Sequence, residues 1–244
     1  MDFDRYLDAL QADGALLAKT ARADLTLPVP SCPGWVVRDV VSHVATVYQH
    51  KIACMRLGRA PDPWPPEPPT GDPVDWLEAS LIELVAELVD RGPTAPSYTW
   101  FEEDQTVGFW YRRMAQETAV HRVDVQLAFG PPTPIDADIA VDGIGEILDA
   151  FFAGDWSDIP QPGPRQVIAL APDDAPGRVV TLQPESVAVE PSSSEAVDAS
   201  VAGSASGLLL WLWRRLDAAE ADLRTTGDDE AIQALTDRLL LVTQ

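Results

Sequence analysis

The chain has 244 residues, enough for one large domain or two modest ones, and its 46% hydrophobic and 23% charged residues are ordinary for a globular protein. Asp and Glu number 39 against 17 Lys and Arg, so the net charge is −22 at pH 7. A surface this acidic repels phosphate backbones and anionic membrane faces, and we therefore expect neither nucleic acid nor membrane as a partner.

The first half of the chain contains four segments whose apolar residues recur every three or four positions, as they do in amphipathic helices. These segments are residues 3 to 25, 36 to 57, 74 to 91 and 109 to 129. Residues 58 to 75 hold seven prolines, so we expect a long loop between the second and third helices. Four helices with such connections predict a helical bundle.

The periodicity changes after a proline cluster at residues 131 to 134. Helical patterns are found at residues 138 to 152, 203 to 217 and 228 to 241. Short β-prone stretches, separated by turn residues, are found at residues 166 to 170, 179 to 182, 187 to 189 and 199 to 201. We therefore predict an α+β protein: a four-helix bundle over residues 1 to 130, followed by a small α+β domain with an antiparallel sheet over residues 131 to 244.

Glu117 and His121 are the first candidates for a functional site. They stand four residues apart in a strongly periodic segment, so both side chains project from one helix face and can hold a single ion. Met114 and Val125 share that face, which points the pair toward the bundle interior. A buried charge needs compensation. A bound cation would supply it, and the alternative is an ion pair between Glu117 and Arg113.

A third metal ligand has to come from another helix, and the chain offers two further histidines. His43 lies between Val40 and Val47 on the apolar side of its segment. His50 follows seven residues later, about 10 Å further along the helix axis, so both rings cannot bind one ion with bonds near 2 Å. His43, deeper in the apolar pattern, is the better candidate. We expect His50, near the helix end, to face solvent or to line the wall of a pocket.

Two histidines and one carboxylate leave at least one position of a zinc ion open, as in catalytic zinc sites. A thiol bound at that position would lose its proton and become a nucleophile at neutral pH. Zn²⁺ suits this ligand set, although nickel, cobalt or iron would also fit. Cys32 and Cys54 lack the close spacing of zinc-binding cysteines, and we expect buried, inert thiols.

Two stretches around these candidates resemble the mycothiol-dependent maleylpyruvate isomerase family, which is built on a DinB-like four-helix bundle. VPSCPGWVVRDVVSH, at residues 29 to 43, is similar to the Cys-Pro-Gly-Trp stretch that leads into the helix with the family's first histidine. RMAQETAVHRVD, at residues 113 to 124, resembles its Glu-x3-His-Arg-x-Asp signature. The likeness extends to a sterol-carrier-like C-terminal domain, with matching landmarks at residues 140 to 151, 205 to 216 and 225 to 235.

Two positions depart from the family pattern, and one motif residue has two interpretations. Val36 replaces a helix-capping Thr or Ser, which should cost about 1 kcal/mol of stability. Arg214 stands where the family often has Gly. Asp124, at the end of the second signature, either contacts a metal-binding residue without binding the metal itself or is a surface carboxylate.

The resemblance implies that His43, Glu117 and His121 bind a divalent metal, most simply Zn²⁺, and that mycothiol is the cosubstrate. Its thiolate would add to a small electrophile, either to isomerise a cis double bond or to form a stable thioether by S-transfer. Arg214 and Arg215 could bind substrate carboxylates, or they are surface charges at a helix end. The alternative to an enzyme is a metal-binding or regulatory small-molecule-binding module.

The remaining expectations concern location and assembly. The opening residues MDFDRY lack the basic and then apolar order of a signal peptide, and the longest apolar run, residues 208 to 213, is too short to span a membrane. Two cysteines are too few for a disulfide scaffold. We expect a monomer in the reducing cytoplasm, with a small electrophile and a low-molecular-weight thiol as its partners.

Overall fold

The computed structural model describes residues 1–65, 69–192 and 196–243. The chain forms two compact units, Met1–Thr133 and Pro134–Gln244. Within the predicted proline-rich loop of residues 58 to 75, residues 66–68 lie outside the described residues, and the described part of that loop has no helix or strand before Pro73.

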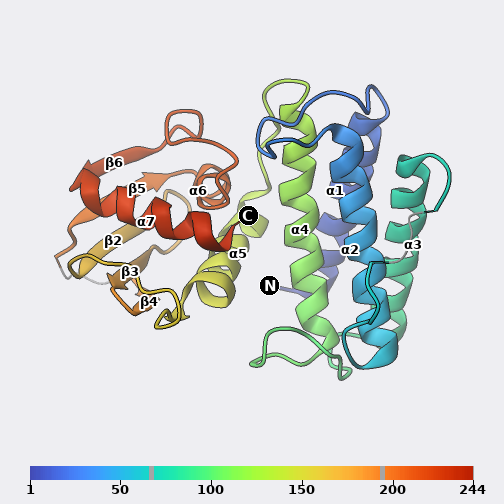
Figure 1. Ribbon diagram of the computed structural model, residues 1–244, viewed down its shortest axis with the longest axis horizontal. Coiled ribbons are helices and arrows are strands. Elements are labelled where there is room, and N and C mark those ends of the chain that lie inside the picture. The colour runs from blue at the N-terminus through green and yellow to red at the C-terminus, as the bar shows by residue number, and fades with distance from the viewer. Residues whose placement is uncertain (66–68, 193–195, 244) are drawn as a thin grey trace. The chain divides into compact units, whose positions relative to one another are not determined.

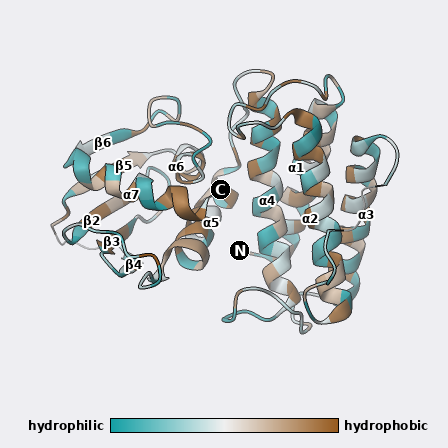
Figure 2. Ribbon diagram, in the orientation of Figure 1, coloured by the Kyte–Doolittle hydropathy of each residue, from teal (hydrophilic) through white to brown (hydrophobic). Residues whose placement is uncertain are grey.

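The first unit is a bundle of four helices (Figure 1): α1 (Phe3–Ala21), α2 (Val37–Leu57), α3 (Pro73–Arg91) and α4 (Val107–Leu127). Hydrophilic and hydrophobic residues alternate around the turns of these helices, as expected for amphipathic segments (Figure 2). α1 packs mainly against α4, and α2 packs mainly against α3. The interior is filled by buried side chains that include Leu10, Leu17, Val44, Leu84, Trp110 and Met114. The predicted helical bundle is confirmed.

Local hydrogen bonds explain where two of these helices begin and end. α1 ends at Ala21, four residues before the predicted end, and the Asp24 carboxylate accepts hydrogen bonds from the backbone N–H and the hydroxyl of Thr26 at 2.8 and 2.7 Å. Such a turn competes with helix continuation. At the start of α2, Val36 offers no capping oxygen, but its N–H donates to the Asp39 carboxylate at 2.9 Å. Asp39 thereby supplies half of a capping box.

The second unit is an α+β domain, as predicted. Its helices are α5 (Ala137–Glu146), which continues into a π-helical turn (Ile147–Phe152), α6 (Ala205–Leu212) and α7 (Asp229–Val242). Its strands are β1 (Gly154–Asp155), β2 (Gln166–Pro172), β3 (Arg178–Gln183), β4 (Ser186–Pro191), β5 (Ala199–Gly203) and β6 (Arg224–Gly227). α6 and α7 pack against β2 and β5. The core includes Ile168, Leu170, Val180, Leu182, Val201, Leu208, Leu209, Leu235 and Leu239.

The sheet differs from the predicted antiparallel arrangement at one pair. The strand order is β1-β4-β3-β2-β5-β6, and β2 and β5 run parallel, with Ile168 opposite Ala199. The other four pairs are antiparallel. The sheet is therefore mixed: β5 lies on the side of β2 that is opposite to β3, and it runs in the same direction as β2. The alternation of residues along a strand does not reveal which neighbour it pairs with.

The sequence patterns missed the two outer strands and overestimated α6. β6 is short and fully exposed, so it has no apolar alternation to signal a strand. α6 ends at Leu212, five residues before the predicted end, because Arg214 takes a left-handed conformation with φ +59°. The N–H groups of Arg214 and Arg215 donate to the carbonyl oxygens of Trp211 and Leu210, both at 2.8 Å. This is the Schellman pattern that ends a helix, in which glycine is the favoured residue at the left-handed position.

A membrane-spanning helix needs a long, nearly uncharged apolar stretch. Among the residues that the structure describes, no helix meets that requirement.

Candidate metal centre

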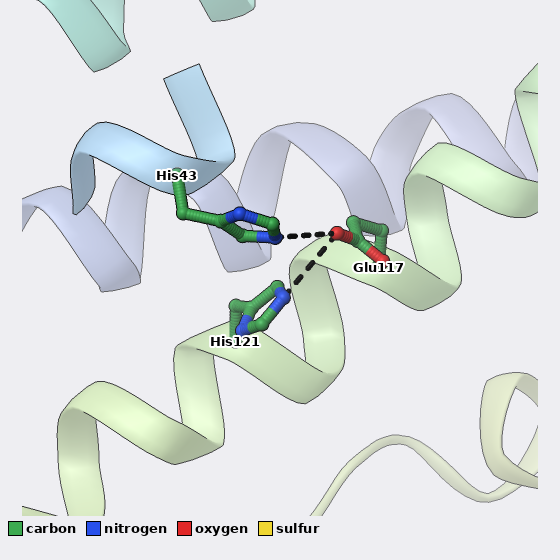
Figure 3. Close-up of side chains that lie close together, drawn as sticks. All are labelled: His43, Glu117 and His121. Atoms are coloured by element: carbon green, nitrogen blue, oxygen red, sulfur yellow. Dashed lines mark ion pairs between the residues drawn. The ribbon is translucent and has the colours of Figure 1, made fainter. Parts of the chain in front are cut away.

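The three predicted metal ligands come together inside the bundle (Figure 3). His43 lies in the second turn of α2, while Glu117 and His121 lie one turn apart on α4. The imidazole of His43 points across to α4, where the other two side chains project from the same face. Two helices that are distant in the sequence therefore supply one compact group of nitrogen and oxygen atoms.

The arrangement is centred on one carboxylate oxygen. Oε1 of Glu117 lies 3.4 Å from Nε2 of His43 and 3.3 Å from Nε2 of His121, and all three ligand atoms lie within 4.8 Å of one another. Ligand atoms around a tetrahedral zinc ion, with bonds near 2.0–2.2 Å, are separated by about 3.3 Å. The donor types and their spacing therefore fit a divalent cation. The side chain of His43 is 37% exposed, so the site can be reached from solvent.

Arg113 contacts the same carboxylate without displacing His43 or His121, the other two candidate metal ligands. Its Nη2 lies 3.0 Å from Oε2 of Glu117, whereas both imidazoles face Oε1. The ion pair that the sequence suggested as an alternative therefore exists beside the three-residue cluster. By holding one carboxylate oxygen, Arg113 orients the other toward the histidines.

Asp124 fixes the orientation of the His121 ring. Its Oδ2 accepts a hydrogen bond from Nδ1 of His121 at 2.8 Å, and its Oδ1 accepts one from the Ser31 hydroxyl at 2.6 Å. The side chain is fully buried, so the interpretation as a surface carboxylate is wrong. A proton held on Nδ1 leaves the lone pair of Nε2 directed at the cluster, which is the arrangement found behind histidine ligands of metals.

The loop before α2 contributes two residues that the sequence analysis did not assign to the site. Ser31 reaches Asp124, and the Trp35 ring lies against the His43 ring with centroids 5.3 Å apart. Both residues belong to the stretch that resembles the family's Cys-Pro-Gly-Trp motif, but their spacing from the cluster carries no periodic signal. The motif was the only indication that this loop lies beside the histidines.

Burial and opposite charges compete in setting the pKa values of the cluster. Burial favours the neutral carboxyl of Glu117, but the charge and hydrogen bond of His121, with help from His43 and Arg113, hold its pKa well below the usual range. Burial likewise opposes the charged form of His121, yet Glu117 and Asp124 raise its pKa to about 9. In the absence of a metal, His121 is therefore protonated at neutral pH, and a binding cation displaces that proton.

We expect the metal-free protein to lose stability as the pH rises toward 9. The pKa of His121 is raised from 6.5 to about 9, so its contribution is complete below pH 6.5 and is lost as the pH rises through about 9. The lowered pKa of Glu117 has the opposite pH dependence. The stability that it contributes is present at neutral pH and is lost only as the pH falls below the usual carboxyl range. Urea unfolding of chelator-treated protein should show a decrease on the order of 2 kcal/mol across this window. If His121→Gln lost the same amount of stability over this pH range, the assignment of the pH dependence to His121 would be wrong.

His50 lies outside the cluster. Its Nδ1 is 3.2 Å from Nζ of Lys51 and 3.5 Å from Sγ of Cys54, and its ring lies edge-on to Trp64 with centroids 5.0 Å apart. Cys54 is buried and Cys32 is half-buried, and neither belongs to the described metal-ligand cluster.

The two arginines proposed for substrate carboxylates belong to the second unit. Arg214 is exposed and occupies the left-handed position at the end of α6. Arg215 is half-buried, donates to the carbonyl oxygen of Trp213 at 2.7 Å and lies over the ring of that tryptophan. Both residues thus have structural roles at a helix end, and their contact with a substrate stays a prediction.

A helical bundle with a partly buried His–Glu–His group, followed by an α+β domain with a mixed sheet, defines a two-domain protein with a candidate metal centre. The chain belongs to the mycothiol maleylpyruvate isomerase family. The family's N-terminal domain matches residues 7–126, and the MDMPI C-terminal domain matches residues 138–234. The resemblance predicted from the sequence is confirmed.

The solved structures that share this fold include two of a mycothiol-dependent maleylpyruvate isomerase. A crystal structure of a mutant of the mycothiol-dependent maleylpyruvate isomerase has a TM-score of 0.60 at 13% identity, covering 93% of each chain. A crystal structure of the mycothiol-dependent maleylpyruvate isomerase has a TM-score of 0.58 at 14% identity, covering 86% of this chain and 88% of that one. At such identities the likeness shows the fold alone. No curated protein sequence matches the chain.

Proposed function

We propose that the protein is a metal-dependent enzyme that uses mycothiol as a cosubstrate and transfers its thiolate to a small electrophile. The observation that carries this proposal is the position of Glu117 Oε1, 3.3 Å from Nε2 of His121 on the same helix and 3.4 Å from Nε2 of His43 on a second helix. Three protein ligands leave a divalent ion with an open position, which is the feature that separates catalytic from structural zinc sites. Family membership supports the choice of thiol.

The residues around the cluster have distinct tasks in this proposal. His43, Glu117 and His121 would hold Zn²⁺ or a similar cation. Asp124 keeps the proton of His121 on Nδ1, and Arg113 keeps one oxygen of Glu117 turned toward the imidazoles. The partial exposure of His43 leaves a route for a thiol and a substrate.

When bound, a divalent cation stabilises the deprotonated form of a coordinated thiol, and it thereby supplies a nucleophile at neutral pH. The thiolate adds to one carbon of an activated cis double bond, and the electron pair moves onto the conjugated carbonyl group. The former double bond can then rotate. Expulsion of the thiolate restores the alkene in the trans form, which is isomerisation. If the adduct is protonated instead, the product is a thioether, which is S-transfer.

The test is product analysis with purified, zinc-loaded protein, mycothiol and maleylpyruvate. Conversion to the trans isomer with full recovery of thiol identifies an isomerase, whereas accumulation of a thioether with loss of thiol identifies an S-transferase. Chelator-treated protein should give neither product and should recover on addition of zinc. If calorimetry detects no binding of mycothiol to the zinc-loaded protein and neither product forms, the enzyme proposal is wrong. That result would favour the alternative function, a metal-binding or regulatory small-molecule-binding module.

A further inference from the structure

Lys51 stands out because its charge lies within the bundle. The chain has only two lysines, and the other, Lys19, is exposed in the last turn of α1. Lys51 is half-buried on α2, and its Nζ lies 5.0 Å from the ring centroid of Trp110, a fully buried residue of α4. An ammonium over an aromatic face gains some stabilisation, but the ring brings no countercharge.

The ammonium of Lys51 lacks an acidic partner. Within the described parts of the chain, the hydrogen-bond partner of its Nζ is Nδ1 of His50 at 3.2 Å, and no carboxylate lies within the 4.0 Å of an ion pair. Burial lowers the pKa of His50 to about 4, with a further effect from the charge of Lys51, so the ring is neutral and its Nδ1 accepts from the ammonium. A lysine ammonium has three N–H donors, so two of them have no protein acceptor. Burial also lowers the pKa of Lys51 itself.

Lys51 and the metal-ligand cluster share the interface between α2 and α4. Lys51 follows His43 by eight residues on α2, and Trp110 precedes Glu117 by seven residues on α4. At 1.5 Å per residue, these steps correspond to about 12 Å along α2 and about 10 Å along α4, so the level of Lys51 and Trp110 is about 10–12 Å from the cluster along the bundle. Arg113 lies between the two levels, but its guanidinium is engaged by Glu117.

We propose that Lys51 binds a carboxylate of the ligand whose other end occupies the His43–Glu117–His121 cluster, and so selects ligands by the distance between the two ends. That the ligand's other end reacts at the cluster rests on the proposed function. The charge of Glu117 acts on Lys51 only from beyond ion-pair distance, so a ligand carboxylate supplies the direct countercharge and the acceptors that Lys51 lacks, in a partly desolvated place where such a hydrogen bond is strong. The selected ligand is a small molecule with an anionic group about 10 Å from the group that meets the metal.

The test uses linear dicarboxylates, from succinate to sebacate, as calorimetric probes of zinc-loaded protein. One carboxylate can meet the metal and the other can reach Lys51, so affinity should peak for chains with carboxylates about 10 Å apart. Lys51→Met should weaken binding of the best probe about tenfold and abolish the optimum. Lys51→Arg should keep the optimum, and Lys19→Met, the matched control on the surface, should change nothing. Equal affinities in Lys51→Met and the wild type would overturn the proposal.

A second readout separates this proposal from the proposed function. With two lysines, ¹³C-methylation of the side chains gives two lysine signals, whose pKa values can be followed by NMR. In metal-free protein, saturating butyrate should raise the pKa of the Lys51 signal and leave that of Lys19 unchanged. A Lys51 pKa that does not respond contradicts the anion site, whether or not zinc binds. A normal response in a protein that fails to bind zinc contradicts the proposed function alone.

Discussion

His43→Ala and His121→Ala should each lower the affinity for zinc at least a hundredfold. Each substitution removes one of the three candidate ligands, whose atoms lie within 4.8 Å of one another. Structural zinc sites bind with roughly 10–16 kcal/mol shared among their ligands, so the loss of one ligand costs a few kcal/mol. Competition with a chromophoric chelator measures the affinity, and elemental analysis of purified protein measures the retained metal.

His50→Ala is the matched control for this experiment. It removes an imidazole from the same helix, but one that contacts Lys51 and Trp64 and lies outside the cluster. Its zinc content should equal that of the wild type. If the His43→Ala, His121→Ala and His50→Ala proteins all bind zinc as the wild type does, the three-residue cluster is not a metal centre.

Asp124→Asn should weaken zinc binding about tenfold to a hundredfold, the usual effect of removing a carboxylate behind a histidine ligand. The asparagine oxygen can still accept a hydrogen bond from Nδ1 of His121, but it has no negative charge to raise the basicity of the ring as a metal ligand. Its amide group can face the Ser31 hydroxyl, so the fold should be preserved. The affinity is measured by the same chelator competition, and circular dichroism checks the fold.

Asp13→Asn provides the comparison with a half-buried acid in the same unit that pairs with a buried arginine. Asp13 accepts from Nε of the buried Arg122 at 3.0 Å, and this pair ties α1 to α4 away from the cluster. Asp13→Asn should reduce the free energy of unfolding and leave zinc affinity unchanged. Loss of zinc affinity in Asp13→Asn but not in Asp124→Asn would contradict the role of Asp124.

The helices and the pairing of Glu117 with His121 could be predicted because both depend on local spacing. A four-residue step returns to one helix face, and the apolar neighbours on that face show that it turns inward. The boundaries were less predictable. The turn at Asp24 ends α1 early, and the left-handed conformation of Arg214 ends α6 at Leu212, because single hydrogen bonds and dihedral angles decide helix ends.

The sheet was predictable in its strands and less so in its pairing. The four central strands have β-prone residues, but the exposed edge strand β6 has no apolar alternation. The parallel pair of β2 and β5 joins residues about thirty positions apart, such as Ile168 and Ala199. Such pairing depends on how the chain crosses the sheet, and no periodicity within either strand records that path.

The sequence by itself determined which residue types lie on which helix face, and hence that one acid and two imidazoles can face the interior of the bundle. Only the tertiary structure decided how they are supported: Ser31 behind Asp124, and Arg113 on one oxygen of Glu117. The tertiary structure alone also decided that the ammonium of Lys51 contacts a histidine and, among the described residues, has no carboxylate within ion-pair distance. Periodicity acts over a few residues of one helix, whereas these contacts join separate segments and exist only once the segments have packed together.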